Sequence, residues 1–95
     1  MILLEDNRLR VKGNLLMGTV PALFAEGLQY LNRENLVLDF AQVEIADSSA
    51  VSLLLGWLRV AQQNKRELQI ENLPESLVNL AGLYGVADFI PSQVV

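Results

Sequence analysis

Residues 45–58 have the sequence Ile45-Ala46-Asp47-Ser48-Ser49-Ala50-Val51-Ser52-Leu53-Leu54-Leu55-Gly56-Trp57-Leu58. Asp47, Ser48 and Ser49 stand directly before a long apolar run, and their short side chains can accept hydrogen bonds from the unpaired N–H groups of a first helical turn. Upstream, residues 36–40 are nearly all apolar, which is typical of a buried central strand. The stretch therefore predicts a strand, a short loop and a helix, with Asp47 as a cap and the serines at the helix start.

The predicted helix has two unlike faces. At about 100° per residue, its broad apolar face carries Ala50, Leu53, Leu54, Trp57, Leu58, Val60 and Ala61. The opposite face carries Ser48, Ser52, Leu55, Gly56, Arg59 and Gln63. This second face is mostly polar with one exposed leucine, so it is the side that can meet a partner. A solvated surface headed by an ordinary N-cap serine explains the same pattern and stays open as an alternative.

The remaining strands are predicted from short apolar or alternating segments. Residues 1–5 predict a short strand, and Asp6-Asn7 suits the positive φ angles of a tight hairpin turn. In residues 9–15 apolar and polar side chains alternate, which indicates a strand with one face on the core. A further strand is expected over residues 67–71, with Leu68 and Ile70 pointing inward.

Helices are expected between these strands. One is predicted from Thr19, with Pro21 in its first turn, to about Asn32, and another after Pro74 with Gly85 as its C-terminal stop. The order of elements predicts an α/β domain with a mixed four- to five-stranded sheet covered by helices. We expect a single domain over residues 1–95, with a short apolar closure over residues 86–90 and a loose tail over residues 91–95.

Composition excludes several classes of function. The 95 residues include no histidine and no cysteine, which removes disulfides, thiolate metal ligands and the usual general base. The formal net charge of −4 argues against nucleic acid as a partner. The apolar start meets Glu5 and Asp6 at once, unlike a signal peptide, and the apolar run from Val51 to Leu58 is too short to span a bilayer. We therefore expect a soluble, cytoplasmic protein without direct membrane insertion.

Catalysis, cofactors and a metal site are not expected. A serine nucleophile needs a nearby base, and besides the missing histidine the chain offers only Lys12 and Lys65 as lysines. It contains no Gly-x-Ser-x-Gly elbow and no Gly-rich phosphate loop. Asp39, Glu44 and Asp47 cluster in sequence and could hold a divalent cation, although such acids more often cap helices and line loops.

The order of these motifs resembles the STAS domain family, which includes the anti-sigma-factor antagonists and the small MlaB-like STAS subunits of lipid-asymmetry ABC transporters. The resemblance rests on Asp47-Ser48-Ser49 at a helix start after an apolar strand and on Gly13 at the end of the second strand. It also rests on residues 68–73 (LQIENL) and residues 77–86 (LVNLAGLYGV). The resemblance implies the STAS fold and a non-catalytic protein-binding module.

Two roles follow from the resemblance. As an MlaB-like subunit, the chain would dock on the cytoplasmic ATPase subunit of a phospholipid-transporting ABC system, with Ser48 as a small interface hydroxyl. As an anti-sigma-factor antagonist, it would be phosphorylated at Ser48 by a serine kinase and would bind an anti-sigma factor. Those antagonists typically carry Gly after the two hydroxyl residues and Gly-Glu-x-Asp after the second strand, where this chain has Ala50 and Gly13-Asn14-Leu15-Leu16. The transporter role is therefore the favoured prediction.

The expected partner-binding residues lie along the helix, and they are Ser48, Ser49, Ser52, Leu55, Gly56 and Arg59. In this hypothesis Leu55 supplies the apolar centre of the contact. Gly56 lets a partner backbone approach closely, and Arg59 pairs with a partner carboxylate. If the helix face is not the interface, the loops expected at residues 17–20 and 42–46, which flank the same helix start, are the next candidates.

Overall fold

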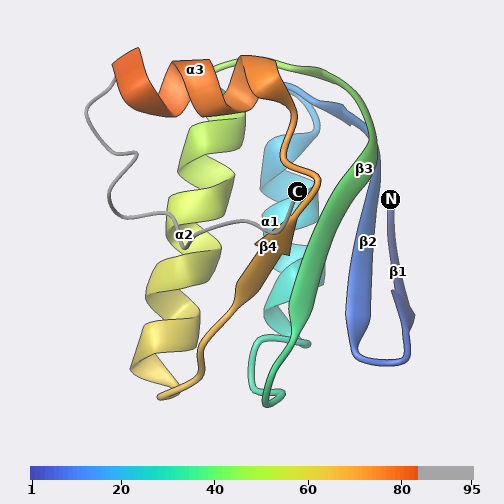
Figure 1. The fold of residues 1–95 in the computed structure, drawn as a ribbon, viewed down its shortest axis with the longest axis vertical. Helices are drawn as coiled ribbons and strands as arrows, with labels where there is room; N and C mark the ends of the chain where they lie inside the picture. Colours follow the sequence, from blue (N-terminus) through green and yellow to red (C-terminus); the bar gives the residue numbers. More distant parts are fainter. Residues whose placement is uncertain (84–95) are drawn as a thin grey trace.

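The fold places helices on one face of a mixed four-stranded sheet (Figure 1). A computed structural model describes residues 1–83. The sheet order follows the chain: β1 (Ile2–Glu5), β2 (Arg8–Leu15), β3 (Val37–Ala46) and β4 (Gln69–Glu71). β1 runs antiparallel to β2, whereas β2, β3 and β4 are parallel to one another. The predicted mixed sheet is confirmed, and the expected closure at residues 86–90 and tail at 91–95 lie outside the described residues.

Three helices connect and flank the strands: α1 (Val20–Leu28), α2 (Ser49–Gln63) and α3 (Glu75–Leu83). α1 joins β2 to β3 and α2 joins β3 to β4, so each is the crossover between two neighbouring parallel strands. Because such crossovers share one hand and both step across the sheet in the same direction, α1 and α2 lie on the same face. The first helix ends at Leu28 and not near Asn32 as predicted.

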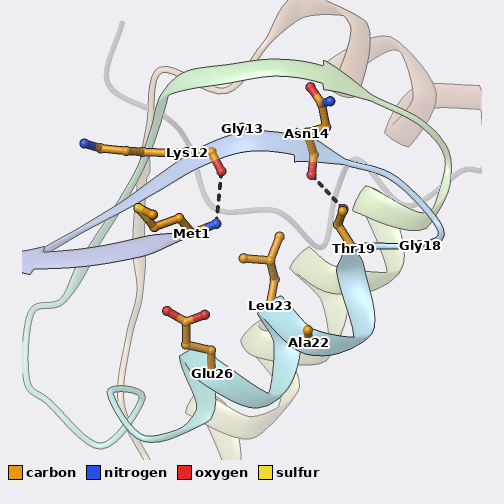
Figure 2. A pocket seen from close by; sticks show the side chains of 9 residues that line it. All are labelled: Met1, Lys12, Gly13, Asn14, Gly18, Thr19, Ala22, Leu23 and Glu26. Carbon is orange, nitrogen blue, oxygen red and sulfur yellow. Dashed lines mark hydrogen bonds between the residues drawn. The ribbon is translucent and has the colours of Figure 1, made fainter.

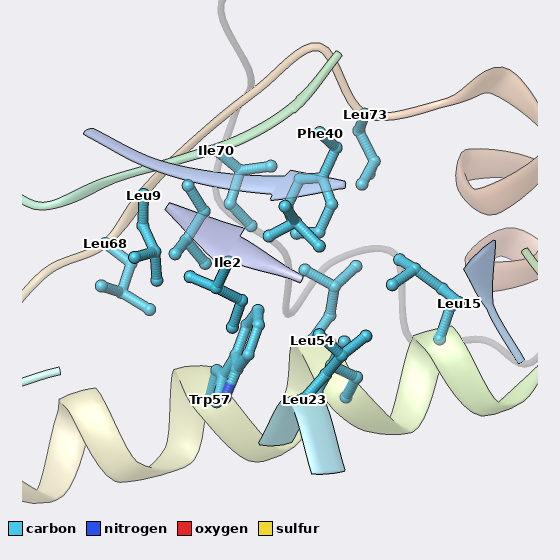
Figure 3. Packing of buried hydrophobic residues seen from close by; sticks show 14 of the residues in the cluster. Ile2, Leu9, Leu15, Leu23, Phe40, Leu54, Trp57, Leu68, Ile70 and Leu73 are labelled. Carbon is cyan, nitrogen blue, oxygen red and sulfur yellow. The ribbon is translucent and has the colours of Figure 1, made fainter. Parts of the chain in front are cut away.

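The core fills the space between that sheet face and the two helices (Figure 3). The predicted alternation is confirmed in β2, where Leu9 and Val11 are fully buried. The predicted helix wheel is broadly right for α2, because Ala50, Leu53, Leu54, Trp57 and Ala61 are buried. The buried stripe is wider than predicted at one edge, where Val51 joins it, and narrower at the other, where Leu58 and Val60 are only partly buried.

α1 and α2 meet through a reciprocal packing of rings on glycines. Trp57 of α2 lies so close to Gly27 of α1 that a Cβ on Gly27 would stand 2.5 Å from the indole ring. In return, a Cβ on Gly56 of α2 would stand 2.7 Å from the ring of Phe24 in α1. The Trp57 Nε1–H also donates a hydrogen bond to the Phe24 carbonyl at 3.2 Å. These glycines let the two helix backbones approach, which fixes how α2 sits over the sheet.

β3 is twice as long as the sequence predicted. Residues 42–46 were expected as a loop, but they continue the strand and pair with Lys12, Gly13 and Leu15 of β2. The register shifts on both sides of Gly13, whose φ of +93° favours glycine. The extension carries mostly exposed side chains, so backbone pairing and not apolar burial forms it. Hydrophobic pattern alone therefore could not predict it.

The outer face of the sheet carries a partly buried ionic network. Arg8 Nη1 lies 2.6 Å from Glu71 Oε1 and 3.1 Å from Asp39 Oδ2, so it joins β2, β3 and β4. Asp39 also accepts hydrogen bonds from Asn72 Nδ2 at 3.0 Å and from the Ala41 N–H at 2.9 Å. Burial raises the pKa of Asp39, but the bonds from Asn72, Ala41 and Arg8 outweigh it and lower the pKa below its usual value. Asp39 is thus a carboxylate that helps to hold β2, β3 and the segment after β4 together.

We expect the stability of the protein to fall in acid partly through Asp39. A carboxyl whose pKa is lowered on folding contributes stability above its unfolded pKa of about 3.9 and loses it as the pH falls through the folded pKa. Asp39→Asn should therefore be less stable than the wild type at pH 7, and this gap should narrow below about pH 4. Urea unfolding at several pH values measures the gap. A gap that stays constant from pH 7 to pH 3 would contradict the assignment.

Candidate functional site

The start of α2 is held by Asp47, which ties it to the end of β2. The Asp47 N–H donates to the Leu15 carbonyl at 3.0 Å, and its Oδ2 accepts the Met17 N–H at 3.1 Å. Its Oδ1 accepts the Ser49 N–H at 2.8 Å and the Ser49 hydroxyl. The hydrogen bond from the Ser49 hydroxyl, followed by those from the Ser49 and Met17 N–H groups, lowers the pKa of Asp47. The ionised Asp47 therefore caps the helix and anchors the loop after β2.

Ser48 does not cap the helix with its hydroxyl. Its backbone occupies the N-cap position with φ −63° and ψ −20°, but its side chain makes no capping hydrogen bond and is exposed. The interpretation of Ser48 as an ordinary N-cap serine is thus wrong, because Asp47 already accepts the hydrogen bond from the first turn. Ser48 is therefore an exposed residue at the head of α2 whose side chain makes no capping hydrogen bond.

Two large apolar side chains are exposed beside this helix start. Met17 is 78% exposed in the loop after β2, and Ile45 is 58% exposed near the end of β3. Both lie in segments next to Asp47. The Met17 N–H donates a hydrogen bond to the Asp47 carboxylate, and Ile45 lies in β3, which ends directly before Asp47. We define the Ser48 face as Met17, Ile45, Ser48 and Ser52, all of which are exposed. The only sequence signal for Met17 and Ile45 was their place in the flanking segments 17–20 and 42–46.

The remaining predicted contact residues do not form one free patch. Leu55 is partly buried and packs against the core, so it is not the exposed apolar centre that the helix wheel predicted. Gly56 packs closely against the ring of Phe24 in α1. Phe24 therefore fills the space beside Gly56 that was predicted to receive the backbone of a partner protein. Ser49 is partly buried and bonded to Asp47, while Arg59 is exposed two turns along α2 from Ser52. The candidate site therefore shifts from the middle of α2 to its N-terminal end.

A hollow of about 520 Å³ lies between the start of β1, the end of β2 and α1 (Figure 2). Gly13 and Gly18 line it, and nothing lies within 4 Å of where their Cβ atoms would be. The Thr19 hydroxyl on its wall is engaged within the chain, since it donates to the Asn14 carbonyl at 2.7 Å and accepts the Leu16 N–H at 3.0 Å. The hollow is thus an open depression without a converging polar set.

The described part of the chain, residues 1–83, shows neither a group of three or more acids close enough to hold a metal ion nor a helix long and apolar enough to cross a membrane. The Ser48 face presents two serine hydroxyls and two exposed apolar side chains. It lies next to the Asp47 carboxylate, whose oxygens are hydrogen-bonded within the chain.

Comparison with known proteins identifies the family. Comparison with curated proteins found no match. A solved structure described as the anti-sigma factor antagonist SpoIIAA in its unphosphorylated form has the same fold, with a TM-score of 0.74 and 16% sequence identity. That similarity covers 100% of this chain and 87% of the other. The family model described as "Mlab, STAS domain" matches residues 2–92, and the chain belongs to the STAS domain family.

Proposed function

We propose that this chain is a non-catalytic protein-binding module whose partner docks on the Ser48 face. The observation that carries the proposal is that Ser48 is exposed and its hydroxyl makes no capping hydrogen bond. The two segments that flank it carry the exposed side chains of Met17 and Ile45. Exposed apolar side chains beside a small polar group are the composition of a contact surface, with the aliphatic groups supplying burial and the hydroxyl supplying a hydrogen bond. STAS domains are in general regulatory and binding modules, which supports the same conclusion.

The partner that we propose is the cytoplasmic ATPase subunit of a phospholipid-transporting ABC system. The description of the matching family model supports this choice. The sequence supports it too, because this chain has Ala50 and Gly13-Asn14-Leu15-Leu16 where anti-sigma-factor antagonists typically carry Gly and Gly-Glu-x-Asp. Ser48 therefore acts as a small uncharged contact that lets the ATPase subunit come close.

The alternative is an anti-sigma-factor antagonist that is switched by phosphorylation of Ser48. The solvent-facing hydroxyl favours it, because a kinase can reach Ser48 without unfolding the helix. A phosphate would then bring about −1.5 to −2 charges to the contact surface and repel a docked partner. The two roles differ in the cognate protein: an ATPase with a permease encoded nearby supports transport, and a serine kinase with a sigma factor supports the switch.

Ser48→Glu should weaken binding to the ATPase subunit at least about tenfold, because it buries a charge at the centre of the contact. The matched control is Ser76→Glu, which places the same charge at an exposed serine in the first turn of α3. Both variants should unfold within about 0.5 kcal/mol of the wild type, since neither replaced side chain is buried. Surface plasmon resonance or a quantitative pull-down measures the effect. Equal affinities of the two variants for the ATPase subunit would show that Ser48 is not part of the interface.

A further inference from the structure

The outer edge of β1 presents unpaired backbone groups. β1 is the first strand of the sheet, and its partner β2 lies on one side only (Figure 1). The Lys12 N–H donates to the Met1 carbonyl at 2.8 Å, which makes Met1 and Lys12 a hydrogen-bonded pair. Since such pairs alternate in an antiparallel ladder, Leu3 and Glu5 also turn their backbone groups toward β2. The N–H and C=O groups of Ile2 and Leu4 consequently point away from the sheet.

This edge lacks several of the features that usually protect an edge strand, although β1 has only four residues and ends in Glu5. β1 contains no proline and no lysine, and its register with β2 runs without a bulge from Ile2 to Glu5. Among residues 1–83 no strand, helix or loop pairs with its outer side. Its side chains are apolar up to Glu5, and Leu3 is 43% exposed on the outer sheet face. An unpaired and mostly apolar edge is a template for another strand.

We propose that β1 pairs antiparallel with β1 of a second copy of this chain, about a two-fold axis at Leu3. This register places Ile2 opposite Leu4 of the second copy and Leu4 opposite its Ile2. Each of these two pairs can exchange two backbone hydrogen bonds, so all the outward groups of Ile2 and Leu4 are satisfied. An axis at Ile2 or at Leu4 would satisfy only one such pair, because β1 spans Ile2–Glu5 and the turn begins at Asp6.

The side chains on both faces suit this register. On the helix side, Ile2 and the partly buried Leu4 would continue the core across the axis. On the outer face, the two Leu3 side chains would meet at the axis, and Glu5 would lie opposite Met1 of the second copy, next to its Lys12. Lys12 forms no ion pair within the described part of the chain, so it is available to Glu5 of the second copy.

The pairing leaves the Ser48 face open. β1 pairs with Arg8–Val11 in the first half of β2, whereas Met17 and Ser48 lie beyond Leu15 at its far end. The product would be a dimer with one continuous eight-stranded sheet. Because the two surfaces are separate, loss of this dimer and loss of partner binding are distinguishable.

A cysteine at the two-fold axis tests the register. Opposed Leu3 residues would form a non-hydrogen-bonded pair with Cα atoms about 4.5 Å apart, which a disulfide can bridge. Because the chain has no cysteine, Leu3→Cys introduces a unique thiol. Under mild oxidation it should give a covalent dimer at least ten times faster than Leu28→Cys, the matched control on α1 that is 38% exposed. Equal rates for the two variants would overturn the proposal.

A charge at the axis tests the same contact without covalent chemistry. Leu3→Lys would set like charges directly opposite each other, and its dimer should dissociate at least tenfold more readily than that of the Leu28→Lys control. Sedimentation equilibrium measures the dissociation constants, and circular dichroism checks that both variants are folded. A wild-type protein that stays monomeric up to millimolar concentration, or a dimer that Leu3→Lys leaves intact, would also overturn the proposal.

Discussion

Trp57→Ala is expected to lower the free energy of unfolding by about 3–5 kcal/mol. The indole is 0% exposed, lies between the sheet and the two helices, and is the largest buried side chain among the described residues. Its removal leaves a cavity that the rigid sheet and Gly27 cannot fill, and it also leaves the Phe24 carbonyl without its indole donor. Since domains of this size have a free energy of unfolding of about 5–15 kcal/mol, the substitution removes a large part of the stability of the protein.

Thermal unfolding followed by circular dichroism measures this loss, because Trp57 is the sole tryptophan and the variant has no indole fluorescence. For a domain of this length the cost corresponds to a fall in Tm of at least about 12 °C. Trp57→Phe is the graded control, since it keeps an aromatic ring but loses the bond to Phe24. We expect the Tm of Trp57→Phe to lie between those of the wild type and the alanine variant. A fall of less than about 4 °C for Trp57→Ala would show that the core does not depend on this ring.

Gly27→Val is expected to destabilise the protein by about 3 kcal/mol, the upper end of overpacking costs. Even a Cβ at this position would stand 2.5 Å from the Trp57 ring, and the ring has no free space to move because it is fully buried. Replacing glycine in a helix normally gains up to about 1 kcal/mol of helix propensity. At Gly27 the steric clash reverses that gain. Urea unfolding at pH 7 gives the free energy directly.

Gly82→Val is the matched control for this prediction. Gly82 lies in α3, is exposed, and has nothing within 4 Å of where a Cβ would stand, so valine there should be close to neutral. A double variant, Gly27→Val with Trp57→Phe, tests the cause. The phenyl ring is smaller than the indole that meets the Cβ, so the two changes together should cost less than the sum of their separate costs. Additive costs would show that the two sites do not interact.

The fold was largely predictable because its signals are local. Alternation in β2, the apolar β3 core and the capping group before α2 each depend on residues a few positions apart. The buried stripe of α2 follows from helix geometry alone, and Trp57 was correctly placed in it. Composition also bounded the chemistry, since a chain without histidine or cysteine lacks the usual general base and thiolate ligands.

The site was less predictable because its residues are defined by partners far away in sequence. Among three adjacent residues that can all cap a helix, Asp47 takes the role because Leu15 and Met17 hold it in place across 30 or more positions. The sequence predicted Asp47 as a cap, but it did not show that the Ser48 hydroxyl makes no capping hydrogen bond, because that depends on these distant contacts. The exposed Met17 and Ile45 beside it become neighbours of the helix start through the same bonds and through the extended pairing of β3 with β2.

The sequence by itself determined the order of the strands and helices and which face of α2 is apolar, but not the extension of β3 over residues 42–46 or the end of α1 at Leu28. Only the tertiary structure decided that Gly56 receives Phe24 and not a partner, that Leu55 packs on the core, and that β1 ends the sheet with an open edge. The physical reason is that a residue's periodicity shows which side of its own element it occupies. What lies opposite that side depends on how the elements cross and pair, and contacts between distant segments set this arrangement.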